Sequence, residues 1–253
     1  MRNTFFAICS IATVLAMQLT ANAQWGDVEM SFVYDGKPPA PAVAAAGRDG
    51  VAPLDQTWLV DKDGGVKNVV VRLLVDKEAK LPIHPDFEKA KGTNVRVDLV
   101  GGYFEPRITI KYTNQDLTFT NLDPFAYAIR ADFLQCSPFN VLVKGNNLVT
   151  LDAEKSHLNK HEPMVAPLAD SIHPGMKGYI LIHSHPYAAV SDGEGKVKLK
   201  NVPVGEWTFV LWHEAGGYIR KGTLDGVAAE WPKGRIKINV EPGVNKVGVV
   251  KFK

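Results

Sequence analysis

The stretch DSIHPGM, which runs from Asp170 to Met176, places a carboxylate, an imidazole and a thioether close together. Shortly after it comes Tyr179–His183, a continuous apolar run of the kind expected for a strand that is buried on both faces. Imidazole and sulfur donors suit transition metals, whereas a carboxylate is a hard oxygen donor. The stretch therefore combines two side chains that suit a soft metal ion, His173 and Met176, with one that does not, Asp170.

Short strand patterns dominate the chain on both sides of this stretch, and helical periodicity is scarce. Alternating or β-branched runs bounded by turn residues predict strands at 28–34, 67–75, 95–99, 107–111, 117–121, 196–199, 207–213, 235–240 and 246–252. Many short strands with regular turn signals are typical of antiparallel sandwiches. We therefore expect an all-β chain, built from two units.

The first residues have the pattern of an export signal. Arg2 gives a positive start, residues 5–19 form an apolar run that is short for a bilayer span, and Ala21-Asn22-Ala23 suits signal cleavage. We expect residues 1–23 to be a signal peptide and the mature protein to be periplasmic or secreted, with no membrane span. A retained membrane anchor is the alternative.

Charge and cysteine content narrow the expected partners. The chain has 29 Lys plus Arg against 27 Asp plus Glu, a balance that gives no reason to expect nucleic acid as a partner. Because Cys9 lies inside the apolar run, signal cleavage would leave only Cys136, and no internal disulfide is expected. Cys136 would be a free thiol, an intermolecular bridge or a metal ligand, or simply a small buried apolar residue.

Four short motifs follow one another along the middle of the chain: FEPR at 104–107, NLDPFAYA at 121–128, DSIHPGM at 170–176 and HPY at 185–187. In their order they resemble the motifs of exported cupredoxin-like proteins, often described as methylamine-utilisation or plastocyanin-like. That family has Phe-x-Pro-His, Asn-x-Asp-Pro before a His-Asn pair, Cys-x-Ile-His-Pro-x-Met and His-Pro-Tyr. The resemblance implies a cupredoxin-like Greek-key sandwich over residues 77–186.

The metal-binding positions of this family mostly differ here. The family's ligand and neighbouring positions fall on Arg107, Tyr127, Ala128 and Asp170, and only His173 and Met176 match. A type 1 copper site needs a thiolate and two imidazoles. The resemblance therefore implies a degenerate copper site without a cofactor. We expect a non-catalytic binding or structural module that contacts a protein or small ligand outside the cytoplasm.

A copper-binding electron carrier with a different ligand set is the alternative. Its candidate ligands are His173, Met176, His185, His183, Cys136 and Asp170. His183 and His185 are two residues apart on an expected strand and would share one face, where His173 or Asp170 would complete a copper or zinc site. The simpler interpretation has His185 packed at the strand end and His183 exposed.

The terminal parts of the chain carry a second resemblance. An Asp-Gly turn at 192–193 and a Pro-x-Gly turn at 203–205 flank expected strands, and 34–38 reads Tyr-Asp-Gly-Lys-Pro. These features resemble a carboxypeptidase-regulatory or transthyretin-like β-domain. The resemblance implies a discontinuous domain, residues 25–76 and 187–253, with segment 77–186 inserted at a loop, where insertion is easily tolerated. One continuous sandwich with appended strands is the alternative.

Catalytic motifs are scarce, so an enzyme is not expected. The sequence has no Gly-x-Ser-x-Gly elbow, His-Glu-x-x-His helix, phosphate loop or dinucleotide fingerprint. His213 and Glu214 are neighbours on an expected strand and should face opposite ways, so they are not expected to act as an acid–base pair. The resembling family has Trp-His-Glu here too, which suggests a structural role at a domain junction. His157 and His161 lie in a polar stretch interpreted as a solvated loop.

Overall fold

The computed structural model describes residues 24–47, 49–75, 81–90 and 92–253, so the expected signal peptide, residues 1–23, lies outside the described residues. Within these residues, nineteen strands form four sheets, and two short 3-10 helices accompany them, η1 (Pro85–Ala90) and η2 (Pro232–Gly234). The fold is all-β, as the sequence predicts. In the part of the chain that is described, no helix has the length and apolar character needed to cross a membrane.

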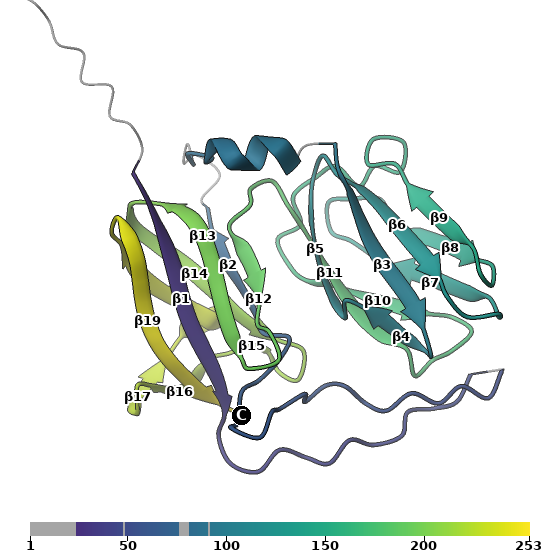
Figure 1. Ribbon diagram of the computed structural model, residues 1–253, viewed down its shortest axis with the longest axis horizontal. Coiled ribbons are helices and arrows are strands. Elements are labelled where there is room, and N and C mark those ends of the chain that lie inside the picture. The colour runs from purple at the N-terminus through teal and green to yellow at the C-terminus, as the bar shows by residue number, and fades with distance from the viewer. Residues whose placement is uncertain (1–23, 48, 76–80, 91) are drawn as a thin grey trace, which may run out of the picture.

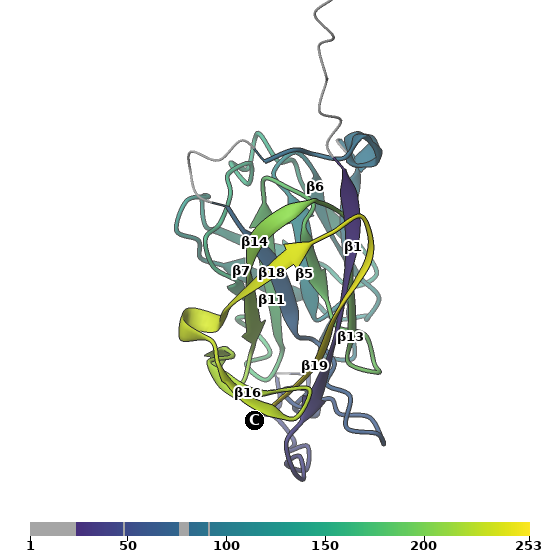
Figure 2. The same ribbon diagram turned by 90° about the vertical axis from the view of Figure 1, so that its left-hand side faces the viewer.

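Strands from the two ends of the chain form one pair of sheets, here named the terminal sandwich (Figure 1). Its first sheet has the order β13 (Lys196–Pro203), β1 (Trp25–Tyr34), β19 (Gly243–Phe252), β16 (Lys221–Leu224) and β17 (Val227–Glu230). Its second has the order β12 (Ala188–Val190), β2 (Val70–Leu74), β14 (Gly205–His213) and β15 (Gly217–Tyr218), with β18 (Arg235–Val240) paired to β14. Figure 2 shows β1 and β19 side by side, where they pair in parallel.

The middle of the chain forms the second pair of sheets, here named the central sandwich. One sheet has the order β4 (Tyr103–Glu105), β3 (Asn94–Val100), β6 (Asp116–Asn121) and β9 (Leu148–Leu151). The other has the order β5 (Ile108–Tyr112), β11 (Lys177–His183), β10 (Ala166–Asp170), β7 (Tyr127–Ala131) and β8 (Phe139–Val143). Each sandwich encloses its own apolar core.

Strand β11 shows how the apolar pattern places the sandwiches against each other. Ile180 and Ile182 point into the core of the central sandwich. Leu181 points the other way and packs with Val70 of the terminal sandwich and with Ile108. Successive side chains of a strand face opposite sides, so a continuous apolar run gives a strand buried on both. The expectation for Tyr179–His183 is therefore met, and the second face of β11 lies at the junction of the sandwiches.

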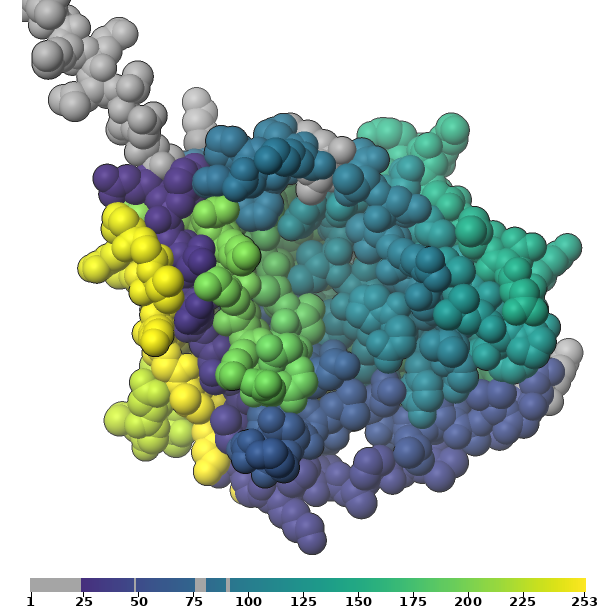
Figure 3. All heavy atoms as spheres, in the orientation of Figure 1, coloured from purple at the N-terminus to yellow at the C-terminus, as the bar shows by residue number. Residues whose placement is uncertain are grey.

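A long connection between β1 and β2 leaves the terminal sandwich and runs along the lower end of the central one (Figure 1). Its middle part, residues 42–47 and 49–55, is named the strap. Backbone hydrogen bonds from Ala44 to Pro53 and from Asp55 to Ala42 fold the strap back on itself. The amide of Leu54 also donates to the Tyr103 hydroxyl, at 2.7 Å. Figure 3 shows the atoms of this connection lying against the base of the central sandwich.

Ser191 fastens the segment before β2 to the end of β12. Its hydroxyl accepts a hydrogen bond from the Val69 amide at 2.8 Å and donates one to the Val66 carbonyl at 2.7 Å, in a buried position. We expect Ser191→Ala to lower the free energy of unfolding by about 1–3 kcal/mol, because both buried backbone groups lose their partner. Chemical denaturation measures this loss.

Ser184→Ala is the matched control, because Ser184 is exposed. Its effect should stay within about 0.5 kcal/mol. Equal free energies of unfolding for the two variants would show that the Ser191 hydrogen bonds do not stabilise the fold.

Candidate functional site

His173, in the turn after β10, is completely buried and held between two carboxylates. Its Nδ1 contacts the Asp170 carboxylate, and its Nε2 lies 3.2 Å from a carboxylate oxygen of Asp49 in the strap. Each ring nitrogen therefore faces a carboxylate oxygen of this chain. The two carboxylates occupy the directions from which a metal ion would reach the nitrogens.

Asp170 stands where the resembling family has its cysteine, and its carboxylate accepts hydrogen bonds from nearby backbone amides. Its Oδ1 accepts from the amides of Ala128, at 2.7 Å, and Ile172, at 3.1 Å, while Oδ2 contacts His173. Asp170 is buried, so these bonds satisfy a carboxylate that would otherwise be costly to desolvate. The side chain thus fixes the turn that carries His173.

Aromatic rings and the strap close the remaining sides of His173. The rings of Tyr127 and Phe125 lie with centroids 4.9 and 5.3 Å from its own. Burial and a 2.6 Å hydrogen bond to Asp123 raise the pKa of Tyr127 well above its ordinary value, so its hydroxyl stays protonated. A Cβ at Gly47 of the strap would lie 1.9 Å from the His173 ring, so this approach requires glycine.

Met176, the second match to the family pattern, is buried in the core of the central sandwich. The turn around it also packs tightly on the strap. A Cβ at Gly175 would lie 2.6 Å from the Ala45 carbonyl oxygen and 2.8 Å from the Ala44 side chain. The buried side chains of this loop, Asp170, His173 and Met176, are therefore covered by the chain's own residues.

Arg107, at the position of the family's first histidine, pairs with Glu214 of the terminal sandwich. Its Nε lies 2.6 Å from Oε1 and its Nη2 2.7 Å from Oε2, and Nη1 donates to the Lys177 carbonyl at 3.0 Å. The two side chains are only 6% and 1% exposed. A bidentate arginine–carboxylate pair, with two parallel hydrogen bonds, is among the strongest ion pairs in proteins. Arg107 thus joins the two sandwiches.

His213 faces away from Glu214, as expected for neighbours on a strand. Its ring stacks on Trp58, with centroids 4.4 Å apart, and meets Phe252 edge-on. The side chain is buried, and burial lowers the pKa of His213 to about 4. The imidazole is therefore uncharged at neutral pH and serves as a packing group beside the junction.

His183 and His185 lie together at the end of β11, but His173 and Asp170 are not with them. The two rings have centroids 4.5 Å apart, and the third ring beside them belongs to His161. The interpretation of His183 as exposed is wrong, because its face of β11 is covered at the junction and the residue is fully buried. His161 is likewise half-buried rather than in a fully solvated loop.

Cys136 lies in a third place. Its Sγ contacts the Lys160 carbonyl at 3.2 Å, and its amide donates to Glu162 at 2.6 Å. Burial raises the pKa of the thiol, which keeps it protonated. The six candidate ligands therefore divide among three locations. Across the described ranges, no three His, Cys, Asp or Glu side chains are arranged to hold a metal ion.

No family model and no curated protein matches the sequence. Among solved structures, the chain is similar to a reduced mutant of amicyanin, with 13% identity over 36% of this chain and 82% of that one and a TM-score of 0.30. It is similar to the Cu-containing nitrite reductase NirK from Thermus scotoductus SA-01, with 20% identity over 44% of this chain and 25% of that one and a TM-score of 0.31. It is similar to a purple cupredoxin from Nitrosopumilus maritimus, with 15% identity over 35% of this chain and 98% of that one and a TM-score of 0.27.

Removing one partner of the Arg107–Glu214 pair should destabilise the protein strongly. Arg107→Met leaves the Glu214 carboxylate buried without its partner, and we expect a loss of about 3–5 kcal/mol in the free energy of unfolding. Glu214→Leu should cost a similar amount, and the double variant should cost clearly less than the sum. Urea denaturation of all four proteins gives the coupling free energy.

Arg96→Met provides the control, because Arg96 is 58% exposed and pairs with Asp98 on the surface. Exposed pairs contribute about 0–1 kcal/mol. Strictly additive losses at Arg107 and Glu214 would contradict the interpretation of these residues as a coupled pair.

Burial of neutral His213 predicts a loss of stability in acid. Its pKa is about 4 in the folded protein and near 6.5 when unfolded, so the unfolded chain binds the extra proton first as the pH falls below 6.5. Between pH 7.5 and pH 5 this group should lower the free energy of unfolding by about 2 kcal/mol. His213→Phe should remove that part of the pH dependence, measured by denaturation at both pH values with a chelator present. The same pH dependence in both proteins would refute this role.

Proposed function

We propose that this is an exported cupredoxin-like protein whose type 1 copper site has been replaced by internal ion pairs. It then serves outside the cytoplasm as a non-catalytic binding or structural module, with no copper at the His173 position. The observation that carries this proposal is the engagement of both ring nitrogens of His173 by the carboxylates of Asp170 and Asp49.

The chemistry of the remaining positions supports the same conclusion. Blue copper depends on a thiolate, and Asp170 offers a hard oxygen that is already bonded to two amides. Arg107 brings a fixed positive charge where the family has a ligand, and that charge is committed to Glu214. Tyr127 has a protonated hydroxyl bonded to Asp123. Each change removes a ligand and supplies a structural contact instead.

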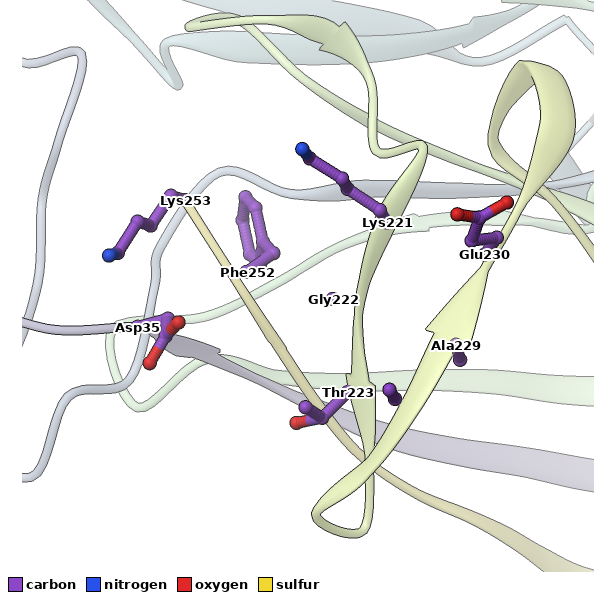
Figure 4. Close-up of a pocket in the computed structure, with 9 residues that line it drawn as sticks. Asp35, Lys221, Gly222, Thr223, Ala229, Glu230, Phe252 and Lys253 are labelled. Carbon is purple, nitrogen blue, oxygen red and sulfur yellow. The ribbon is translucent and has the colours of Figure 1, made fainter.

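A hollow of about 460 Å³ on the terminal sandwich offers a surface for a partner. Figure 4 shows Phe252 between Lys221 and Lys253, with the carboxylates of Asp35 and Glu230 on either side. Charged side chains of both signs around a hollow suit contact with a polar ligand or a protein loop. The proposal therefore places binding on the terminal sandwich rather than at the lost metal loop.

A copper titration tests the proposal. One equivalent of Cu(II) added to the mature protein should produce no intense thiolate-to-copper band in the visible spectrum, because no thiolate lies beside His173. The Cys136→Ser variant is the control, since Cys136 is the sole cysteine after residue 9. An intense band in the native protein that disappears in Cys136→Ser would overturn the proposal by showing that this thiol reaches copper.

A further inference from the structure

Arg72, in β2, is a positive charge in the interior without a negative partner. Its side chain reaches from the terminal sandwich to the segment before β10, where Nη2 donates to the Pro163 carbonyl at 2.7 Å. The residue is only 5% exposed. The ionisable groups that act on it are the Tyr218 hydroxyl and the guanidinium of Arg235, and no carboxylate of the described residues forms an ion pair with it. Because a guanidinium stays charged and buried charges are normally paired, Arg72 indicates a place for an anion.

Three histidines of the central sandwich lie beside this guanidinium and are named the histidine cluster: His161, His183 and His185. The ring centroid of His183 lies 4.7 Å from that of His161 and 4.5 Å from that of His185. Pro163, which accepts the hydrogen bond from Arg72, comes two residues after His161. Burial lowers the pKa values of all three imidazoles, and the charge of Arg72 lowers them further. The rings are therefore neutral at physiological pH.

The cluster presents N–H donors more than lone pairs. Nδ1 of His185 accepts a hydrogen bond from the Tyr187 amide at 3.3 Å, and Nδ1 of His161 accepts one from the Ser184 amide at 3.4 Å. A neutral imidazole carries one proton, so Nε2 of each of these rings is a donor. Nε2 of His185 and both ring nitrogens of His183 are buried and have no partner among the described residues. Because buried donors are nearly always paired, these N–H groups indicate an acceptor at this place.

The carboxylate next to the cluster in the chain is not that acceptor. Oε1 of Glu162 accepts from the amides of Gln135 and Cys136 at 2.8 and 2.6 Å, and its Oε2 accepts from the amide of Leu134 at 3.0 Å. These three hydrogen bonds offset its charge and direct both oxygens toward residues 134–136. A guanidinium and several N–H donors without an acceptor of their own have the chemistry of an anion site.

We propose that Arg72 and the histidine cluster bind one chloride ion at the junction of the two sandwiches. Arg72 supplies the opposite charge from the terminal sandwich, and the Nε2–H groups of His185 and His161 donate to the ion from the central one. The short distances between the rings favour a small spherical anion over a carboxylate or a phosphate. His161 is half-buried and lies outside the strands, so its ring can move to admit the ion. The bound ion then stabilises the junction.

Thermal unfolding in two sodium salts tests this site. At equal pH and ionic strength, about 150 mM chloride should raise the Tm of the mature protein by about 2–4 °C over gluconate, because only the folded protein holds the ion. Arg72→Met should abolish this rise, and His185→Phe, which keeps an aromatic ring without an N–H, should reduce it. Arg96→Met is the matched control, because Arg96 is exposed and should keep the full rise. An equal Tm in the two salts, or a full rise in Arg72→Met, would overturn the proposal.

Bromide in crystals of the native protein gives a test that needs no variant. Bromide takes the place of chloride and is located by its anomalous X-ray scattering. The proposal expects a bromide ion in contact with the Arg72 guanidinium and Nε2 of His185. A water molecule at this place, or bromide at surface positions as an adventitious ion only, would overturn it.

Discussion

The buried pairing of Arg107 with Glu214 fixes how the two sandwiches sit on each other. A charge in this setting is tolerable only when its partner is present, because desolvation of a lone ion costs several kcal/mol. The pairing therefore requires Arg107, just before β5, and Glu214, just after β14, to stay in contact. Apolar contacts complete the same junction, among them the edge-on rings of Tyr179 and Trp212, with centroids 5.1 Å apart. These contacts together hold the two sandwiches against each other.

Two charged groups of the central sandwich are satisfied in the same way. Arg107 and Asp170 both stand where the resembling family has ligands, and both are charged groups satisfied by other parts of the chain. Asp170 stabilises its own turn and His173, and the strap adds Asp49 from the other side. On the proposed function, reversing a single residue would not create a copper site, because the neighbouring side chains already bind one another.

Sequence periodicity predicted the local features well. The alternation in β1 and the continuous run in β11 were sufficient to predict strands, and the opposite directions of His213 and Glu214 followed from strand geometry. Periodicity does not reveal which residues far apart in the sequence contact each other. Residues 39–53 are rich in Ala, Pro and Gly, which indicates a loop but does not indicate that this segment covers His173. The spacing of His183 and His185 gave a common face, but only the packing of the second sandwich decides that this face is buried.

The central claim is that His173 is held by carboxylates and has no nitrogen free for a metal. Nitrogen-15 NMR of the histidine side chains tests it most directly, in the metal-free protein and with one equivalent of Cu(II). The account predicts that the side-chain nitrogen signals of His173 are the same with and without one equivalent of Cu(II). A shift or loss of a His173 nitrogen signal caused by bound copper would contradict the account.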